Sequence, residues 1–418
     1  MPGVFPSAPR TASGVIPIHR GRLRHIYRAA VGRVDGRRCV ADALQRMAPA
    51  PPVVAVAIGK ASAAMLQGAL DVLGTQVREA LMVAKSGYQR PLPGVHSLQA
   101  GHPYPDERSV EAGSAVLSML ARAPAEASLL FLISGGASAL VECPRPGISL
   151  QDLQRVNRWL LGCGMGIHAV NHVRASLSLI KGGRLIRYLG GRRALNWLIS
   201  DVPGDDPSVI GSGLLMPGLG DRRPEQACFP RWLVRLMEGA TPPPVPSTAV
   251  ETLILARPAD ARSAAAEEGR RLGYTVVEHV ELLTGDAETA GRRVVEVLLS
   301  CPPALHVWSG ETTVTLPQRP GVGGRCQHLA LSAAGAMRGR TGLCLLAAGT
   351  DGGDGPTEVA GALVDEATAH RGERAGFQLR AALTGADAGS FLRASGDLVV
   401  TGPTGTNVMD LMLGLRLP

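Results

Sequence analysis

The chain has 418 residues, of which 45% are hydrophobic and 19% charged, a globular composition with enough material for two or three domains. Its net charge of +8 allows an anionic partner, but aromatic residues make up only 3%, so nucleic-acid binding is not expected. No apolar run approaches the roughly 20 residues of a membrane helix. Seven scattered cysteines without a Cys-x-x-Cys pair argue against disulfides and zinc, and favour a reducing, cytoplasmic compartment.

The chain begins with a segment rich in proline, serine, glycine and arginine. Residues 1–20 carry no acidic side chain and are predicted to be an extension ahead of the first domain. A transit peptide has a similar composition, but this segment lacks a convincing amphipathic period. A helix is expected next, over 22–47, because apolar residues recur there at helical spacing.

Strands and helices alternate in the following part of the chain. Continuous apolar runs at 53–58, 80–84 and 129–133 predict buried strands, with helices up to residue 73 and over 107–122. This alternation predicts a doubly wound α/β fold with a mainly parallel sheet. Ligands of such folds bind at the carboxyl ends of the strands, where the glycine-containing polar clusters of this region occur.

The cluster after the third of these strands reads Ser134-Gly135-Gly136-Ala137-Ser138. Two glycines let the backbone approach a ligand, and the N–H groups and serine hydroxyls suit a phosphate or another anion. A glycine turn that only ends the strand is the alternative. Lysine occurs in the chain only as Lys60, Lys85 and Lys181, each beside a glycine cluster, among 43 basic residues. This placement makes the lysines candidates for phosphate contacts.

A polar stripe is predicted on a helix that begins near residue 171. Asn171, Arg174, Ser178 and Lys181 recur at i, i+3, i+7 and i+10, which places them on one face of a helix. The stripe carries two cations and no acid, so it suits an anion site. An ordinary surface helix with a glycine cap at its C-terminus is the alternative.

An acidic turn follows the strand predicted at 194–199. It contains Asp201, Asp205 and Asp206, and three carboxylates within six residues suit a hard cation such as Mg²⁺. A β-turn with capping aspartates is the alternative. The segment 216–247 is the least patterned, and the domain boundary is placed within it, between domains at 21–245 and 246–418.

The second domain is also predicted to be α/β. Its expected strands lie at 250–255, 275–279, 305–308, 343–348 and 398–400, with a strand–turn–strand over 305–315, and its expected helices lie at 259–272, 284–299 and 326–337. Arg325 stands just before a predicted helix, after the glycine-rich run 321–324. An arginine in this position is seldom needed for the fold, so Arg325 is a candidate for contact with an anion.

Several longer motifs occur in a fixed order along the chain. They are Gly59-Lys60-Ala61-Ser62, Gly101-His102-Pro103, Ser134-Gly135-Gly136, Asn171-His172-Val173-Arg174, Lys181-Gly182-Gly183, Ser200-Asp201-Val202, Gly323-Gly324-Arg325, Thr350-Asp351-Gly352 and Thr401-Gly402-Pro403-Thr404-Gly405-Thr406-Asn407. With this set, the chain resembles the glycerate 2-kinases whose C-terminal part is called the MOFRL domain. The resemblance extends from about residue 21 to the C-terminus.

The resemblance implies an ATP-dependent kinase that phosphorylates the 2-hydroxyl of D-glycerate to 2-phosphoglycerate, with Mg²⁺ as the divalent metal. It also implies a large αβα domain followed by a smaller α/β domain, with the active site in the interdomain cleft. A monomer or a homodimer with small-molecule substrates is expected. The chain lacks the Gly-x-x-x-x-Gly-Lys-Ser/Thr motif, so it is not a P-loop kinase.

The resemblance and the residue pattern together suggest roles for individual residues. The lysine and arginine that match Lys60 and Arg325 are regarded as catalytically important in the family, and Asp201 is a further catalytic candidate. The expected contacts to substrate or phosphate are Ser134, Gly135, Gly136, Ser138, Arg174, Lys181, Glu311, Thr404 and Asn407. The expected metal ligands are Asp205, Asp351 and Asp354. Which aspartate accepts the proton of the 2-hydroxyl stays open at this point.

The sequence departs from the family pattern beside the expected site. Relatives usually have asparagine and glutamate at Cys326 and His328, a proline-threonine pair at Leu214-Leu215, and glycine at Trp308. A related small hydroxy acid is therefore an alternative substrate. Hydroxypyruvate reductase, a label often given to this family, is the alternative activity, but it requires a Gly-x-Gly-x-x-Gly fingerprint after a strand, which is not found.

Overall fold

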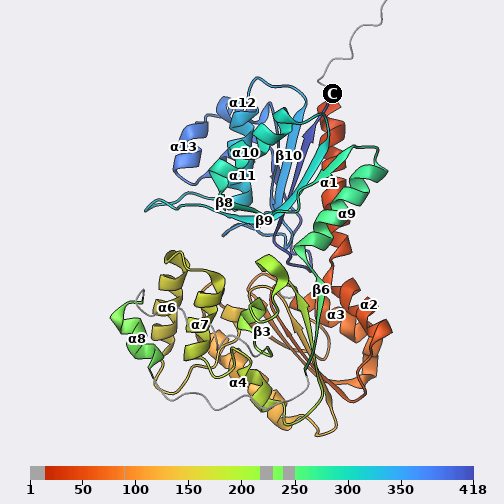
Figure 1. Ribbon diagram of the computed structural model, residues 1–418, viewed down its shortest axis with the longest axis vertical. Helices are drawn as coiled ribbons and strands as arrows, with labels where there is room; N and C mark the ends of the chain where they lie inside the picture. The colour runs from red at the N-terminus through yellow and green to blue at the C-terminus, as the bar shows by residue number, and fades with distance from the viewer. Residues whose placement is uncertain (1–14, 89, 217–228, 239–249) are drawn as a thin grey trace, which may run out of the picture. The chain divides into compact units, whose positions relative to one another are not determined.

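The computed structural model describes residues 15–88, 90–216, 229–238 and 250–418 (Figure 1). The chain divides into two compact units. The parallel-sheet unit consists of residues 34–257 and 403–408, and the mixed-sheet unit consists of the chain up to Arg33 together with 258–402 and 409–418. Most of the predicted N-terminal extension and of the predicted boundary segment lies outside the described residues.

A sheet of six parallel strands forms the centre of the parallel-sheet unit, in the order β3-β2-β1-β4-β5-β6. Its strands are β1 (Val53–Ile58), β2 (Val77–Lys85), β3 (His96–Ala100), β4 (Ser128–Ile133), β5 (Ala194–Ile199) and β6 (Val250–Ala256). β1, β4 and β5 are buried along their whole length, as expected for apolar strands inside a parallel sheet. The predicted doubly wound fold is confirmed, and its strand order reverses between β1 and β4.

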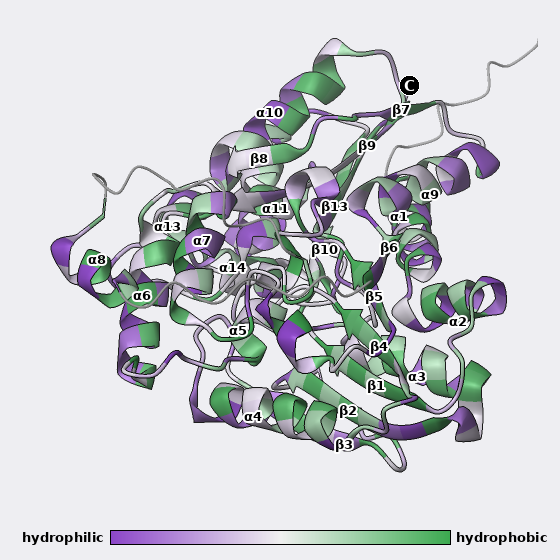
Figure 2. Cartoon of the chain, turned by 60° about the horizontal axis from the view of Figure 1, so that its bottom comes forward, coloured by the Kyte–Doolittle hydropathy of each residue, from purple (hydrophilic) through white to green (hydrophobic). Residues whose placement is uncertain are grey.

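Helices cover this sheet and form a small cluster of their own. They are α2 (Gly36–Arg46), α3 (Ser62–Leu73), α4 (Glu107–Arg122), α5 (Ala137–Leu140), α6 (Leu150–Gly162), α7 (Ile167–Leu177) and α8 (Arg231–Met237). Val116 and Leu120 of α4 share a hydrophobic core with Val56 of β1 and Phe131 of β4. Figure 2 shows the hydrophobic character of β1, β2 and β4, which agrees with the continuous apolar runs that predicted these strands.

The mixed-sheet unit contains a sheet in the order β12-β11-β10-β13-β9-β7, with β8 beside β9. Its strands are β7 (Val276–Glu278), β8 (Leu283–Asp286), β9 (Leu305–Thr313), β10 (Leu343–Gly349), β11 (Gly361–Asp365), β12 (Leu398–Val399) and β13 (Asp410–Arg416). β7 and β8 run parallel to β9, and the other pairs are antiparallel. The predicted α/β class is confirmed, although most of the pairing is antiparallel.

Helices cover both faces of the mixed sheet (Figure 1). They are α1 (Val15–Arg33), α9 (Pro258–Arg271), α10 (Ala287–Ser300), α11 (Arg325–Ala336), α12 (Thr368–Arg374), α13 (Leu379–Thr384) and α14 (Ala388–Ser395). Leu23 of α1 and Ala265 of α9 belong to the core on one face, with Val307 of β9. Leu329 of α11 and Phe391 of α14 belong to the core on the other face. None of the helices among the described residues is long and apolar enough to cross a membrane.

The first predicted helix is two helices in the structure, so the expectation for 22–47 is wrong. α1 begins at Val15, inside the predicted extension, and ends at Arg33. α2 begins at Gly36, and the side chain of its N-cap residue, Asp35, accepts a hydrogen bond from the Arg38 N–H at 2.9 Å. The Asp35 cap starts a new helix, and α1 packs into the mixed-sheet unit by the apolar side that carries Leu23.

The strand predicted at 250–255 does not open the second domain, so this prediction is also wrong. β6 pairs with β5 in the first sheet, with Val250 opposite Ala194, and the units divide at Arg257 and Pro258. Two further segments differ from the sequence prediction. The strand–turn–strand predicted over 305–315 is one strand that ends at Thr313, and the helix predicted over 284–299 begins only at Ala287 because β8 precedes it.

Candidate functional site

The loops after β1 and β4 are joined by backbone hydrogen bonds where the strand order of the parallel sheet reverses. The Lys60 N–H donates to the Gly135 carbonyl at 2.9 Å, and the Ala61 N–H donates to Oγ of Ser134 at 3.0 Å. Gly59 has φ +126°, and a Cβ there would lie 2.6 Å from the Ser134 carbonyl oxygen. Only glycine permits this approach, so the two loops form one rigid edge at the position where doubly wound sheets bind ligands.

Three residues expected from the sequence meet at this edge, although they come from distant parts of the chain. Nδ2 of Asn407 donates to Oδ2 of Asp201 at 2.7 Å. A Cβ on Gly135 would overlap both side chains, so the missing side chain of Gly135 makes room for the Asn407–Asp201 pair. The segment 403–408 is held in this unit by a hydrogen bond from the Gly36 N–H to the Gly405 carbonyl at 3.0 Å.

Lys60 and His102 lie beside Gly136. Gly136 has φ +89°, and a Cβ there would lie 3.2 Å from Cδ2 of His102 and 3.6 Å from Cγ of Lys60. The structure therefore adds an imidazole to the group of residues that the sequence predicted. His102 belongs to a motif that supports the family resemblance, but no role had been assigned to it. Thr404 lies in the same segment as Asn407 and is partly exposed.

Ser138 belongs to a neighbouring network of side chains. Its Oγ lies 2.7 Å from Oγ of Ser212, which in turn donates to Oδ1 of Asn171 at 2.9 Å. Ser212 has φ +60°, a left-handed conformation that a residue other than glycine rarely adopts. Leu214 and Leu215, which replace the family's proline and threonine, are buried in the hydrophobic core. This departure therefore changes core packing and contributes no polar group.

The predicted cationic stripe does not form as one helix face, because α7 ends at Leu177. Lys181 is only 1% exposed, and its Nζ forms an ion pair with Glu142. Glu142 also accepts hydrogen bonds from the Ser178 hydroxyl at 2.6 Å and the Cys143 N–H at 3.0 Å. Burial lowers the pKa of Lys181, and the Glu142 charge partly offsets this effect. The sequence pattern missed Glu142 because its position opposite the lysine depends on tertiary packing.

Arg174 remains on α7, where its Nε donates to Oδ1 of Asn157 at 3.2 Å. Burial lowers its pKa, and the charge of Glu142 opposes that shift. Both cations of the predicted stripe therefore experience the same carboxylate. The interior ion pair of Lys181 differs from the open anion contact that the stripe had suggested.

Arg325 is the first residue of α11 and is held by two carboxylates. Its Nε and Nη2 donate to the two oxygens of Asp410 at 2.6 and 3.0 Å, and its Nη1 lies 2.5 Å from Oε1 of Glu311. Burial alone would lower the pKa of Arg325, but the charges and hydrogen bonds of Asp410, with the charge of Glu311, raise it. The guanidinium therefore stays charged. Asp410 was not among the residues that the sequence suggested.

Asp354 caps α11, which differs from its expected role as a metal ligand. It accepts hydrogen bonds from the backbone N–H groups of Cys326 and Gln327 at 3.0 and 2.8 Å, and from Nε2 of Gln327 at 2.9 Å. Burial and then the charge of Asp410 raise the pKa of Asp354 to about 6, against the effect of these hydrogen bonds. A Cβ on Gly324 would overlap Asp354, so the glycine allows the cap to form.

The other two predicted metal ligands belong to different units of the chain. Asp351 accepts a hydrogen bond from the Gly353 N–H at 2.9 Å in the mixed-sheet unit. Asp205 belongs to the parallel-sheet unit, where its Oδ2 lies 4.0 Å from Nε of Arg257. Among the described residues, no group of three or more His, Cys, Asp or Glu side chains is arranged to hold a metal ion. The Mg²⁺ ligand set, whose members belong to two units, stays a prediction.

The remaining departures from the family pattern are buried in the mixed-sheet unit. Cys326 is buried, and burial followed by the charge of Asp410 raises the pKa of its thiol well above the usual value. His328 is also buried, which lowers its pKa. Trp308 stacks on His279, with ring centroids 4.2 Å apart and an interplanar angle of 10°. Trp308 also covers Gly414, whose added Cβ would lie 3.0 Å from the indole ring.

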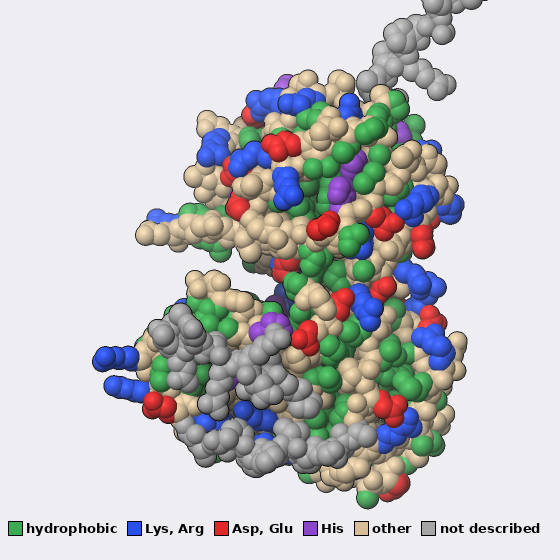
Figure 3. All heavy atoms as spheres, in the orientation of Figure 1, with side chains coloured by type: hydrophobic (Ala, Val, Ile, Leu, Met, Phe, Trp, Pro, Cys, Tyr) green, Lys and Arg blue, Asp and Glu red, His purple; other side chains and the backbone are tan. Residues whose placement is uncertain are grey.

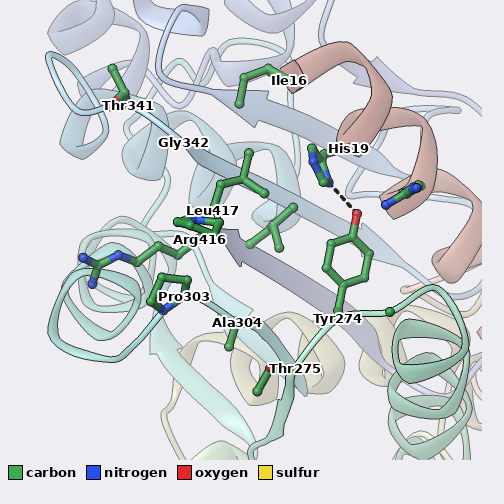
Figure 4. Close-up of a pocket in the computed structure, with 14 residues that line it drawn as sticks. Ile16, His19, Tyr274, Thr275, Pro303, Ala304, Thr341, Gly342, Arg416 and Leu417 are labelled. Carbon is green, nitrogen blue, oxygen red and sulfur yellow. Dashed lines mark hydrogen bonds between the residues drawn. The ribbon is translucent and has the colours of Figure 1, made fainter. Parts of the chain in front are cut away.

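A separate pocket of about 530 Å³ lies in the mixed-sheet unit, between the start of α1, the turn before β7 and the end of β13 (Figure 4). Nδ1 of His19 lies 2.5 Å from the hydroxyl of Tyr274 on its wall. The residues that line this pocket include none of the predicted site residues. On the face shown in Figure 3, the lysine and arginine side chains are scattered among acidic ones and form no single patch.

Two family models match the chain: a domain of unknown function, DUF4147, over residues 22–229, and the MOFRL family over residues 304–410. The D-glycerate 2-kinase of Thermotoga maritima is 34% identical over 87% of this chain and 90% of that protein. The glycerate 2-kinase of Pyrococcus horikoshii is 34% identical over 87% of each chain. A putative hydroxypyruvate reductase of Agrobacterium vitis is 36% identical over 93% of this chain and 92% of that protein. The crystal structure of Thermotoga maritima glycerate kinase has a TM-score of 0.81 and 32% identity, covering 96% of this chain and all of that one.

Proposed function

This chain belongs to the family of glycerate 2-kinases with a MOFRL domain, and we propose that it transfers the γ-phosphoryl group of ATP to the 2-hydroxyl of D-glycerate. The observation that carries this proposal is the group of Lys60, Gly135, Asp201 and Asn407 at the edge where the strand order reverses. These residues come from separate motifs, and each is adjacent to another member of the group. Such an edge is the usual ligand site of a doubly wound sheet.

Phosphoryl transfer needs a positioned acceptor and positive charge around the equatorial phosphoryl oxygens more than it needs covalent help from the protein. In the proposed reaction, the 2-hydroxyl oxygen forms a bond to the γ-phosphorus, and the bond from that phosphorus to the oxygen bridging to the β-phosphate breaks. ADP leaves with that oxygen. Asp201, oriented by the amide of Asn407, takes the hydroxyl proton.

Two cations are proposed to stabilise the transferring group. Lys60 lies beside Gly136, where an added Cβ would be 3.6 Å from its Cγ. Arg325 is kept charged by Asp410 and Glu311 and stands at the start of α11. The backbone of Ser134–Gly136 is proposed to hold phosphate or the glycerate carboxylate. Asp205, Asp351 and Asp354 stay the proposed ligands of Mg²⁺, and no step is assigned to the metal.

A coupled assay of ADP release tests the substrate. D-Glycerate, L-glycerate and related hydroxy acids are supplied with ATP, and D-glycerate is expected to give the highest kcat/KM. A parallel reaction with NADH and hydroxypyruvate tests the alternative activity suggested by the name of the Agrobacterium vitis relative. Steady NADH oxidation without ADP release from any hydroxy acid would refute the kinase proposal.

Substitution of the two cations tests the site. Lys60→Ala and Arg325→Ala should each lower kcat at least ~10²-fold without unfolding the protein, because each removes a preorganised charge. Lys85→Ala is the matched control, since Lys85 also ends a strand of the same sheet but lies over the ring of Tyr88, 5.0 Å from its centroid. Near-normal turnover of Lys60→Ala, or an equal loss in Lys85→Ala, would contradict the assigned role.

A further inference from the structure

Asp410 occupies an unusual position for a carboxylate. It is the first residue of β13, a strand that lies between β9 and β10, and it pairs in register with Gly310 and Gly349. Its relative exposure is only 3%. A buried carboxylate is destabilising unless a cation compensates its charge, and the contacts of Asp410 show that Arg325 provides this compensation.

The two carboxylates that contact Arg325 bind it in different ways. Asp410 accepts two parallel hydrogen bonds, from Nε and Nη2, so it fixes the plane of the guanidinium as well as its position. Oε1 of Glu311 lies 2.5 Å from Nη1, and the Glu311 side chain is 46% exposed. The buried partner therefore determines the orientation of Arg325, whereas the exposed partner lies at the accessible end of the group.

The charge of Asp410 also acts on the surroundings of Arg325. It raises the pKa of Asp354 and that of the Cys326 thiol, in both cases after the larger effect of burial. Asp354 caps the helix that begins with Arg325, and Cys326 is the next residue. Asp410 thus acts on the partly exposed guanidinium, on the carboxylate that caps its helix and on the buried thiol found in place of the family's asparagine.

We propose that Asp410 is the positioning residue for Arg325 and aligns its guanidinium toward the transferring phosphoryl group. This inference rests on the proposed kinase function. Asp410 itself contacts no substrate; it acts through the two hydrogen bonds that determine the plane of the arginine. The precision of this alignment supplies the catalytic effect, because a charge that is already oriented needs no reorganisation when the phosphoryl group moves.

Chemical rescue of an arginine-free variant tests the proposal. Guanidinium ion added to Arg325→Ala should restore part of the kcat, because the carboxylate of Asp410 binds and orients it. The same concentration should restore nothing in the double variant Arg325→Ala/Asp410→Asn. Arg325→Ala/Asp365→Asn is the matched control: Asp365 is another buried aspartate of the same unit, and it pairs with Arg20 and Arg371. Equal rescue in both double variants would overturn the proposal.

One further measurement does not depend on how Asp410→Asn folds, and a second does not depend on the reaction. Arg325→Lys retains a charge but cannot make the two parallel hydrogen bonds, so its kcat should still fall at least ~10²-fold. Phenylglyoxal should modify Arg325 several-fold faster in Asp410→Asn than in the wild type or in Asp365→Asn. An unchanged labelling rate would refute the proposal that Asp410 positions Arg325. If Asp410→Asn is labelled faster but the wild-type protein releases no ADP with glycerate, only the proposed kinase function is refuted. The positioning of Arg325 by Asp410 is then still supported.

Discussion

Breaking the buried pair of Lys181 and Glu142 should lower the stability of the protein. Both side chains are 2% exposed, so removal of one charge leaves the other in the interior without its counterion. Such a loss typically costs about 3–5 kcal/mol of the free energy of unfolding. The perturbation distinguishes an interior ion pair from the anion contact that the sequence suggested for this lysine.

The surroundings of the pair set different costs for the two single variants. In Lys181→Met, the remaining carboxylate keeps its hydrogen bonds from the Ser178 hydroxyl and the Cys143 N–H, so we expect a loss near 3 kcal/mol. In Glu142→Gln, the remaining ammonium has no counterion, and a loss near 5 kcal/mol is expected. The double variant should lose at least ~2 kcal/mol less than the sum of the singles.

Urea unfolding at pH 7 measures these free energies, and ADP release from glycerate measures the activity of the folded variants. The structural reasoning would be refuted if Lys181→Met unfolded within ~1 kcal/mol of the wild type while KM for glycerate rose at least tenfold. That result would show that Lys181 binds the substrate. Additive losses in the double variant would equally contradict a coupled pair.

Three further predictions concern pH, a helix cap and a loop. Burial and then the charge of His279 lower the pKa of His306 to about 4, below the unfolded value near 6.5. The neutral imidazole of His306 should therefore contribute fully to stability above pH 6.5. That contribution, up to about 3 kcal/mol, should be lost as the pH falls to 4. His306→Gln should flatten this part of the Tm–pH profile, and an unchanged slope would contradict the assignment. Asp354→Ala removes the cap of α11 and should lower the free energy of unfolding, measured in urea, by about 1–2 kcal/mol. Unchanged stability with a changed Mg²⁺ dependence of kcat would instead indicate that Asp354 is a metal ligand. Gly135→Ala should lower kcat at least ~10²-fold, because the new Cβ overlaps the side chains of Asn407 and Asp201. Gly162→Ala, which has open space around the new Cβ, should remain active. Equal kcat values in the two variants would refute the role given to Gly135.

Local sequence was sufficient to predict the centre of the first sheet and the polar residues at one of its edges. Apolar runs bounded by glycines located β1, β4 and β5, because buried parallel strands need continuous hydrophobic residues. Lys60, Gly135 and Asp201 each follow one of these strands closely. Parallel strands end at the same edge of a sheet, so any parallel arrangement of neighbouring strands would bring such residues near one another.

Only the tertiary structure decided which charges face one another. Asp410 binds Arg325 across 85 positions of the sequence, and Glu142 meets Lys181 across 39. Asp354 caps a helix that begins 29 positions before it, at Arg325, and β6 joins the first sheet although it follows the least patterned segment. These outcomes depend on strand order, register and long-range packing, which propensity and spacing do not encode. The sequence alone therefore determined the three central strands of the first sheet and the polar residues at their ends, whereas packing determined which of those residues are caps, interior ion pairs or members of the candidate site.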